Sequence, residues 1–169
     1  MKVTNFEALE LLQKGKPLVG LTISGQINLE TNKIWNKEVI IENCEIEYFS
    51  GSVTRFNKVV KLSNTKFKKS QFVFTYFQGG LQIENCVFEE YLDFQSGGHN
   101  QQNTISICNN YFHDFVNFFD CWFESLVLIK NNQFLKGTNL LGKPHDIPVT
   151  FEVTPIIENN LGVLDLNTE

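Results

Sequence analysis

A six-residue segment recurs along the chain at nearly constant spacing, and this repeat limits the fold more than any other feature. Residues 41–46 read IENCEI, and residues 83–88 read IENCVF. Related segments begin at residues 62, 107 and 129, so the period is 21 to 24 residues. A fixed period of this length is typical of solenoids, in which each repeat buries its apolar face against its neighbours.

The copies agree position by position. The first residue is Ile or Leu, the third is always Asn and the sixth is Ile or Phe, and another aliphatic residue lies two positions upstream. The Asn residues are Asn43, Asn64, Asn85, Asn109 and Asn131. Asn tolerates the left-handed conformation that turns require, so we expect this column at a corner of the chain. Residues 157–162, IENNLG, are interpreted as a degenerate further copy.

A finer period of five residues, with one block of six per turn, runs inside each repeat. The centre of nearly every block is a large apolar residue, and the chain has 16 Phe to supply these positions. Two positions earlier the residue is small or aliphatic in most blocks, at Cys44, Thr54, Thr65, Ser70, Thr75 and Cys86. A helix with 3.6 residues per turn does not produce this pattern, whereas a chain that turns a corner every five residues does.

This block pattern resembles the pentapeptide-repeat family over roughly residues 39–94 and 105–136. The resemblance implies four blocks per square turn, with the small and the large apolar residue of each block pointing inward. The position before each centre departs from the family's Asp or Asn, as at Glu45, Arg55 and Lys66. The fold class we expect is therefore an all-β solenoid, a right-handed parallel β-helix of about five to six coils with an N-terminal capping helix.

The ends of a β-helix expose sheet edges, and the sequence predicts covers for both. TNFE at residues 4–7 has the form of a capping box, with Thr4 as N-cap, and predicts a helix of about ten residues with one apolar face. That face comprises Phe6, Ala8, Leu9, Leu11 and Leu12. We expect one domain over 1–169: a cap of helix and incomplete first coil at 1–38, the β-helix at 39–140, and an irregular C-terminal cap at 141–169. Residues 149–153 and 162–166 are predicted to be irregular closing strands.

Two insertions break the register, at residues 96–103 and 141–150, and each carries a histidine, His99 and His145. Both insertions are predicted to leave the same edge of the β-helix. A metal or ligand site between the two histidines is one interpretation and ordinary polar loops are the other. We expect no metal and no cofactor, because no i, i+4 or CxxC frame fixes these residues.

The same edge is predicted to carry an apolar stripe outside the core. Counting blocks places Val53, Phe74, Phe94 and Phe118 or Phe119 at or near one corner, and Tyr76 and Trp122 on the adjoining outer side. One interpretation is that the insertions fold back and cover the stripe. The other is a surface for a partner or for stacking a carbohydrate, since exposed apolar patches mark such sites.

The charge of the chain limits the classes of partner that we expect, and its cysteine content indicates the cellular compartment. The net charge is −5, which argues against direct nucleic-acid binding. Six basic residues and no acidic one lie between Arg55 and Lys69, whereas residues 70–129 contain no Lys or Arg. Such segments are either solvated coils or, for the second, an acidic patch for a basic partner. Four cysteines without CxxC spacing and without a signal peptide predict reduced thiols and a cytoplasmic location. No apolar run approaches the roughly 20 residues of a membrane span, so we expect no membrane association.

No catalytic motif, such as a phosphate loop or GxSxG, is present in the sequence. We therefore expect a non-enzymatic binding or scaffold protein that presents solenoid faces or ends to another protein, with a homodimer as a further option. Two alternatives stay open: a DNA mimic that modulates a type II topoisomerase, which the resemblance implies for some family members, and a carbohydrate-binding or carbohydrate-active β-helix. The candidate binding residues are Phe74, Tyr76, Phe94, His99, Phe118, Trp122 and His145.

Overall fold

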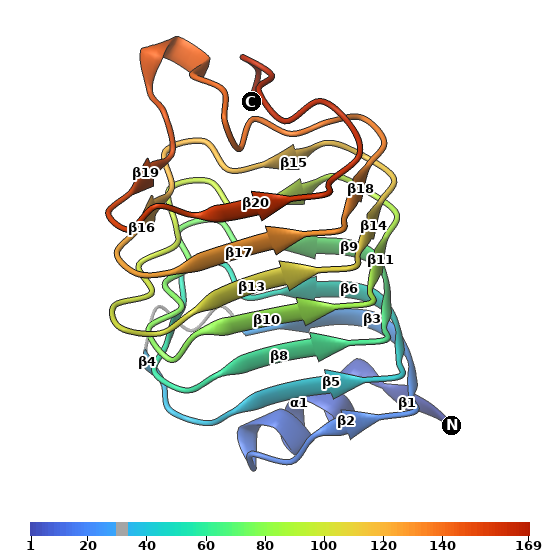
Figure 1. The fold of residues 1–169 in the computed structure, drawn as a ribbon. Helices are drawn as coiled ribbons and strands as arrows, with labels where there is room; N and C mark the ends of the chain where they lie inside the picture. Colours follow the sequence, from blue (N-terminus) through green and yellow to red (C-terminus); the bar gives the residue numbers. More distant parts are fainter. Residues whose placement is uncertain (30–33) are drawn as a thin grey trace.

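Parallel strands stack in about six turns of a β-solenoid in the computed structural model, which describes residues 1–29 and 34–169 (Figure 1). One long sheet runs the length of the molecule in the order β2 (Leu18–Val19), β5 (Val39–Glu42), β8 (Val60–Ser63), β10 (Leu81–Glu84), β13 (Ile105–Cys108), β17 (Val127–Lys130) and β20 (Ile156–Glu158). Each strand follows its predecessor after one turn of the chain. The expected all-β solenoid with an N-terminal helix is confirmed.

The second long sheet forms the adjoining side of each turn. Its order is β1 (Lys2–Thr4), β3 (Thr22–Asn28), β6 (Glu45–Ser50), β9 (Lys66–Gln71), β11 (Val87–Phe88), β14 (Tyr111–Phe112) and β18 (Gln133–Phe134), with β12 (Leu92–Asp93) and β15 (Val116–Asn117) continuing from β9 along the third side. Two short sheets form part of the fourth side, β4 (Ile34–Trp35) with β7 (Arg55–Phe56) and β16 (Trp122–Phe123) with β19 (Thr150–Phe151).

The register places like residues on like residues, as the repeat predicts. Ile83 pairs with Leu62 on one side and Ile107 on the other. On the next side Phe88 pairs with Phe67 and Phe112, and its ring centroid lies 5.0 and 5.2 Å from theirs. These inward side chains are at most 1% exposed. Burial of each ring contributes roughly 1.5–3 kcal/mol, so the columns are the main source of stability.

The predicted corner is also confirmed. All five Asn residues of the repeat, and Asn159 in the last copy, have φ between 48° and 59°. The following position carries a buried amide ladder in the later coils. The Asn132 Oδ1 accepts hydrogen bonds from the Asn110 backbone N–H at 2.9 Å and from its Nδ2 at 3.0 Å, and the Asn132 Nδ2 donates to the Ile107 carbonyl at 2.8 Å. Each coil is thereby tied to the next at the turn.

Phe94 and Phe118 are not outside the core, which corrects the predicted stripe. They form an inner stack with Phe72, with centroids 5.2 Å apart for Phe72 and Phe94 and 5.0 Å apart for Phe94 and Phe118. The reason is one extra residue at an earlier corner. Three residues lie between Phe88 and Leu92, whereas two lie between the equivalent Phe67 and Ser70, so block counting slips from that coil onward.

The N-terminal cap begins with α1 (Asn5–Gln13), whose capping box between Thr4 and Glu7 is present as predicted. Ala8 and Leu12 are buried, and Leu9 and Leu11 pack against the core. Phe6 is 77% exposed, so its assignment to the apolar face is wrong. It lies one position after Asn5, whose side chain instead holds the helix start to the Gln26 carbonyl of β3.

At the C-terminal end, η1 (Pro144–Asp146) precedes β19, and β20 repeats the earlier coils as predicted for residues 157–162. Residues 162–166 do not form the predicted strand. They follow the last coil through single hydrogen bonds, for example from the Thr138 N–H to the Val163 carbonyl at 2.8 Å. Gly162, at φ 112°, allows this segment to approach the Phe134 carbonyl more closely than a Cβ would permit.

Candidate functional site

The outer surface of the fourth side carries a column of one cation and three rings. We call this column, together with Val53 and Phe74 at the adjoining corner, the aromatic edge; the column residues are Arg55, Tyr76, His99 and Trp122. Backbone bridges join Arg55 to Tyr76, Tyr76 to Gly98, and Gly98 to Trp122 in successive coils. Outward residues alternate with inward Phe56, Phe77 and Phe123, so alternation of the short strands sets the direction of each side chain.

His99 reaches this column by leaving the register. The chain places Gly98 opposite Tyr76 and Trp122, which puts His99 in line with the inward Phe residues. Instead, His99 has φ 42° and its ring lies 4.3 Å from that of Tyr76 and 6.1 Å from that of Trp122. Gly98, at φ 102°, is needed here because a Cβ would lie 2.5 Å from the Trp122 carbonyl.

The rings of the column are packed along the solenoid axis. The guanidinium carbon of Arg55 lies 5.7 Å from the centroid of the Tyr76 ring, and the His99 ring is the other neighbour of that ring. The planes of His99 and Trp122 are 25° apart. The rings of Tyr76 and His99 are tilted by 57° to each other, and both residues are partly buried.

The corner beside the column holds two apolar residues in the left-handed region. Val53 has φ 55° and is 46% exposed, and Phe74 has φ 52° and is 54% exposed. The equivalent residues of the next two coils are Ser96 and Asp120, also with positive φ. A β-branched or bulky residue at positive φ is a genuine outlier, and Asn or Gly occupies such a position at lower energy. Exposure and conformation both disfavour Val53 and Phe74 in an isolated chain.

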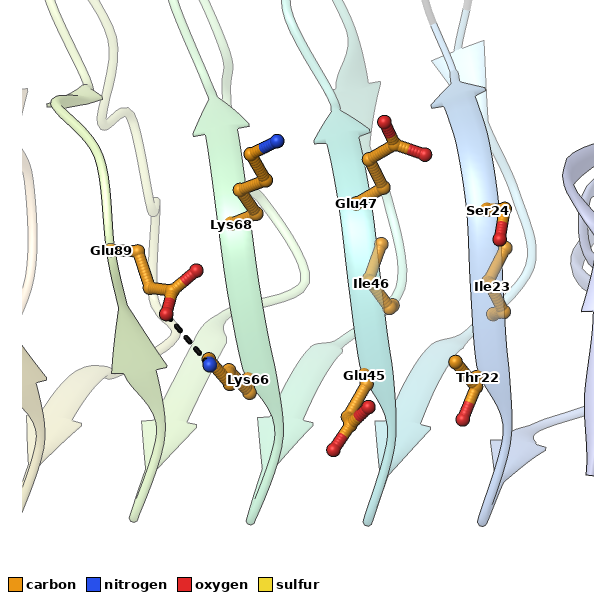
Figure 2. Close-up of a pocket in the computed structure, with 9 residues that line it drawn as sticks. All are labelled: Thr22, Ile23, Ser24, Glu45, Ile46, Glu47, Lys66, Lys68 and Glu89. Atoms are coloured by element: carbon orange, nitrogen blue, oxygen red, sulfur yellow. Dashed lines mark ion pairs between the residues drawn. The ribbon is translucent and has the colours of Figure 1, made fainter.

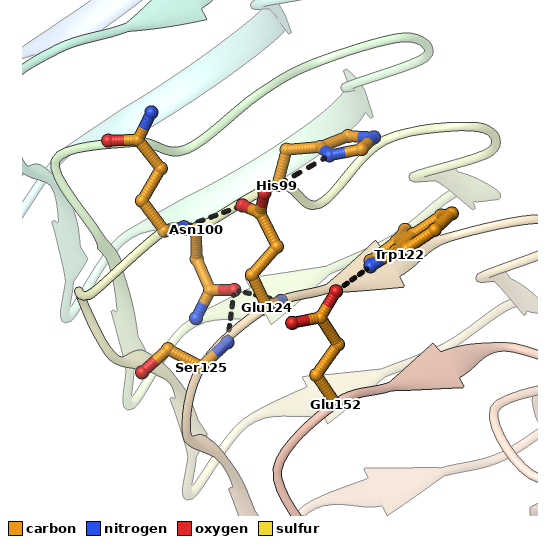
Figure 3. Close-up of polar contacts among 7 residues, drawn as sticks. His99, Asn100, Trp122, Glu124, Ser125 and Glu152 are labelled. Carbon is orange, nitrogen blue, oxygen red and sulfur yellow. Dashed lines mark hydrogen bonds and ion pairs between the residues drawn. The ribbon is translucent and has the colours of Figure 1, made fainter.

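Polar contacts fix the part of the edge around Trp122 (Figure 3). The indole Nε1 donates to the Glu152 Oε1 at 2.8 Å, and the Glu124 Oε1 lies 4.0 Å from the His99 Nδ1. Asn100, which is fully buried, accepts hydrogen bonds at Oδ1 from the Glu124 and Ser125 backbone N–H groups at 2.9 and 3.1 Å. The insertion at 96–103 is therefore an ordered part of the edge.

The insertions leave part of the stripe uncovered. Phe74 and Trp122, which is 47% exposed, remain open to solvent, and Tyr76 is half-buried only through its column neighbours. The interpretation in which the loops fold back over the stripe therefore holds for Tyr76, whose ring lies 4.3 Å from that of His99 in the first insertion, and is wrong for Phe74 and Trp122. The first insertion is held in place by its own bonds, such as that from the Asn103 Nδ2 to the Gln78 carbonyl, and by Asn100.

Of the predicted binding residues, the structure brings together Phe74, Tyr76, His99 and Trp122. Phe94 and Phe118 lie in the core, as described above. His145 belongs to a different environment in η1, with its ring 6.0 Å from that of Phe119 and its Nε2 3.2 Å from the Glu169 Oε1. Within residues 1–29 and 34–169, no three His, Cys, Asp or Glu side chains converge to hold a metal ion.

Arg55, Glu124 and Glu152 belong to the site and were not predicted. A signal for Arg55 was present, because Arg55, Tyr76 and Trp122 all occupy the outward position before a block centre. The two glutamates carry no comparable signal, since Glu152 lies in the irregular C-terminal segment and pairs with Trp122 only through the fold.

A separate shallow depression of about 220 Å³ lies on the outer face of the β3, β6, β9 and β11 strands (Figure 2). Rows of opposite charge alternate across it, with Glu45 and Glu47 on β6, Lys66 and Lys68 on β9, and Glu89 after β11. The Lys66 Nζ forms an ion pair with the Glu89 Oε1 at 2.7 Å. The basic segment of the sequence is thus partly neutralised by neighbouring coils and does not form a continuous cationic surface.

The cysteines are free thiols, as predicted, in the described part of the chain. Burial raises the pKa of the Cys86 thiol to about 11 and that of Cys121 to about 12. Neither thiol is therefore a ready nucleophile at neutral pH, because the thiolate is the reactive form. Among the described residues, no helix is both long enough and apolar enough to span a bilayer.

Comparison with protein-family models, with curated protein sequences and with solved structures gave no significant match. The resemblance to the pentapeptide-repeat family rests on the block pattern alone.

Proposed function

We propose that this protein is a non-enzymatic β-helical binding protein that holds another protein on its aromatic edge. The observation that carries the proposal is the pair Val53 and Phe74, which are exposed apolar residues in a left-handed backbone conformation. Strain of this kind costs of the order of 1–3 kcal/mol at a residue and is concentrated at functional sites. A partner that buries both side chains would supply the reason for keeping them.

The composition of the edge also supports a protein partner. Aromatic residues and Arg are enriched in protein interfaces and dominate their binding energy, and the edge contains Phe74, Tyr76, Trp122 and Arg55. Their positions are set by the solenoid and by bonds such as that from Trp122 to Glu152 at 2.8 Å. A surface ordered before binding loses less conformational entropy when the partner docks.

The geometry favours a protein over a carbohydrate. A sugar ring stacks on an open aromatic face, and the column offers one well-exposed ring, Trp122, because the Tyr76 ring is flanked by Arg55 at 5.7 Å and by His99 at 4.3 Å. Charge favours it over DNA mimicry, because the lysines of β9 interrupt the acidic rows of the neighbouring strands. A DNA mimic needs a continuous anionic surface to compete for a nucleic-acid site.

The test is affinity capture from a lysate of the native host with immobilised protein and with the Phe74→Asn variant. Asn accepts the left-handed conformation of residue 74, so the variant changes the surface without straining the corner. Phe6→Asn is the matched control, since Phe6 is 77% exposed on α1, away from the edge. We expect a partner that binds the wild type and Phe6→Asn and is lost with Phe74→Asn; equal recovery on all three would contradict the proposal.

A further inference from the structure

We infer that the partner held by the aromatic edge presents a basic side chain, arginine or lysine, at the Trp122 end. The inference rests on the proposed function, because it specifies the partner of the same surface. The two ends of the column differ in a way that points to this chemistry. One end is closed by the chain's own cation, Arg55, at 5.7 Å from the Tyr76 ring. The other end finishes on an indole.

Trp122 is the ring of the column with room for a cation. His99 lies on one side of it, with the centroids 6.1 Å apart. On the other side the paired residue of the next coil is Thr150, whose side chain is too small to cover an indole. The ring accordingly stays 47% exposed. An arginine or lysine side chain over a Trp face gains cation–π attraction, and Trp is the most favourable ring for it.

Three carboxylates surround this end of the edge. Glu152 accepts the indole N–H at 2.8 Å, Glu124 accepts the Gln101 backbone N–H at 2.8 Å, and Asp120 accepts the Ser96 hydroxyl at 3.1 Å. In the part of the chain that the structure describes, no Lys or Arg forms an ion pair with any of the three. This agrees with the absence of Lys and Arg from residues 70–129.

Exposed aromatic area therefore occurs together with carboxylates that have no Lys or Arg partner among the described residues, although Glu124 lies 4.0 Å from the His99 Nδ1. A basic side chain satisfies both, because its charge pairs with the carboxylates and its stem covers apolar surface. Phe74 and Val53, which lie two and three coils from Trp122, would contact apolar residues farther along the partner. An acidic segment would be repelled, and a neutral apolar one would leave the carboxylates without a counter-charge.

The experiment follows the Trp122 indole N–H resonance by NMR while a peptide is added at millimolar concentration. The chain has two Trp residues, so a Trp122→Phe variant assigns the signal. The probes are a blocked Gly-Leu-Arg-Leu-Gly pentapeptide and the same peptide with citrulline, which keeps the shape of arginine without its charge. We expect the arginine peptide to bind about threefold to tenfold more tightly.

Two variants and one control locate the effect. Glu124→Gln and Glu152→Gln should each reduce the preference for arginine about twofold to fivefold, the range of an exposed ion pair. Glu152→Gln still accepts the indole N–H, so Trp122 keeps its position. Glu84→Gln, an exposed carboxylate on β10, should leave the preference unchanged.

The outcomes separate the two proposals. If the arginine and citrulline peptides bind equally, or if Glu84→Gln has the same effect as the edge variants, the inference is overturned and the aromatic edge stands as a docking surface. If neither peptide shifts the Trp122 signal or any signal from Phe74 and Tyr76, the edge does not take peptides, and the proposed function falls with the inference.

Discussion

Replacing Phe88 by Ala tests the buried column on which the solenoid depends. The Phe88 ring is 1% exposed and lies between the rings of Phe67 and Phe112, at 5.0 and 5.2 Å. Removing a buried Phe side chain costs about 3–5 kcal/mol through lost burial and the cavity that remains. Two stacked neighbours and a stiff backbone on both sides oppose collapse of that cavity, so we expect a value near the upper end.

Two further variants separate the ring contacts from the simple loss of volume. Phe88→Leu fills much of the space without a ring, and we expect it to cost about 1–2 kcal/mol. Lys66→Ala removes an outward side chain of the neighbouring strand and its ion pair with Glu89, which is worth less than about 1 kcal/mol at an exposed position.

The assay is equilibrium unfolding in urea, monitored by far-ultraviolet circular dichroism. The fit gives the free energy of unfolding and the m value, which is the slope of that free energy against urea concentration. A coil in the centre of a solenoid also connects the turns on both sides of it. For this reason, a lower m value for Phe88→Ala would indicate that the coils on the two sides of Phe88 unfold separately. A loss below about 1 kcal/mol for Phe88→Ala, or a larger loss for Lys66→Ala, would refute the assignment of inward and outward faces.

Three other changes have expected outcomes. Asn132→Leu leaves the buried Asn110 N–H groups without their acceptor and should cost about 2–4 kcal/mol in urea unfolding, whereas a loss within error would mean that the amide ladder is not coupled to stability. Burial raises the pKa of Asp93, so its charged form opposes folding; Asp93→Asn should stabilise the protein at pH 7, and this gain should shrink as the pH falls through the raised pKa and be lost well below the ordinary Asp pKa of about 3.9, where Asp93 is protonated in both states. A gain that grows on acidification would reverse the sign of that argument. Phe74→Asn should keep or raise the free energy of unfolding, by up to about 1 kcal/mol, because Asn accepts the left-handed backbone; a clear loss would mean that the phenyl ring stabilises the isolated chain.

The repeat predicts the inner architecture well because it reports on backbone geometry directly. Ile or Leu in the first position and Asn in the third can recur only if each turn has the same path, and the pairing of Leu62 with Ile83 follows from that alone. The same holds for the Asn corner, where φ of 48° to 59° restricts the residues that fit. Both features are local consequences of composition and spacing.

The outer surface was harder to predict, because its residues are free to vary and small register changes move them. The extra residue between Phe88 and Leu92 shifted Phe94 and Phe118 into the core. Gly98 allowed His99 to turn out of the core by taking a backbone path that no other residue fits. Each of these two register changes depends on a single residue, and the repeat pattern does not predict either of them.

In this fold, the columns that stabilise the chain differ from the outer column proposed to bind a partner. Inward residues such as Phe88 hold the coils together, so a change there is costly for the whole chain. Outward residues are under no such restraint, and a left-handed corner should drift toward Asn or Gly, as the Asn corner of the repeat illustrates. Val53 and Phe74 depart from that expectation at the corner that adjoins Arg55 and Tyr76. Under the proposed function, a partner that covers this edge is the reason that these strained apolar residues are kept beside Arg55 and Tyr76.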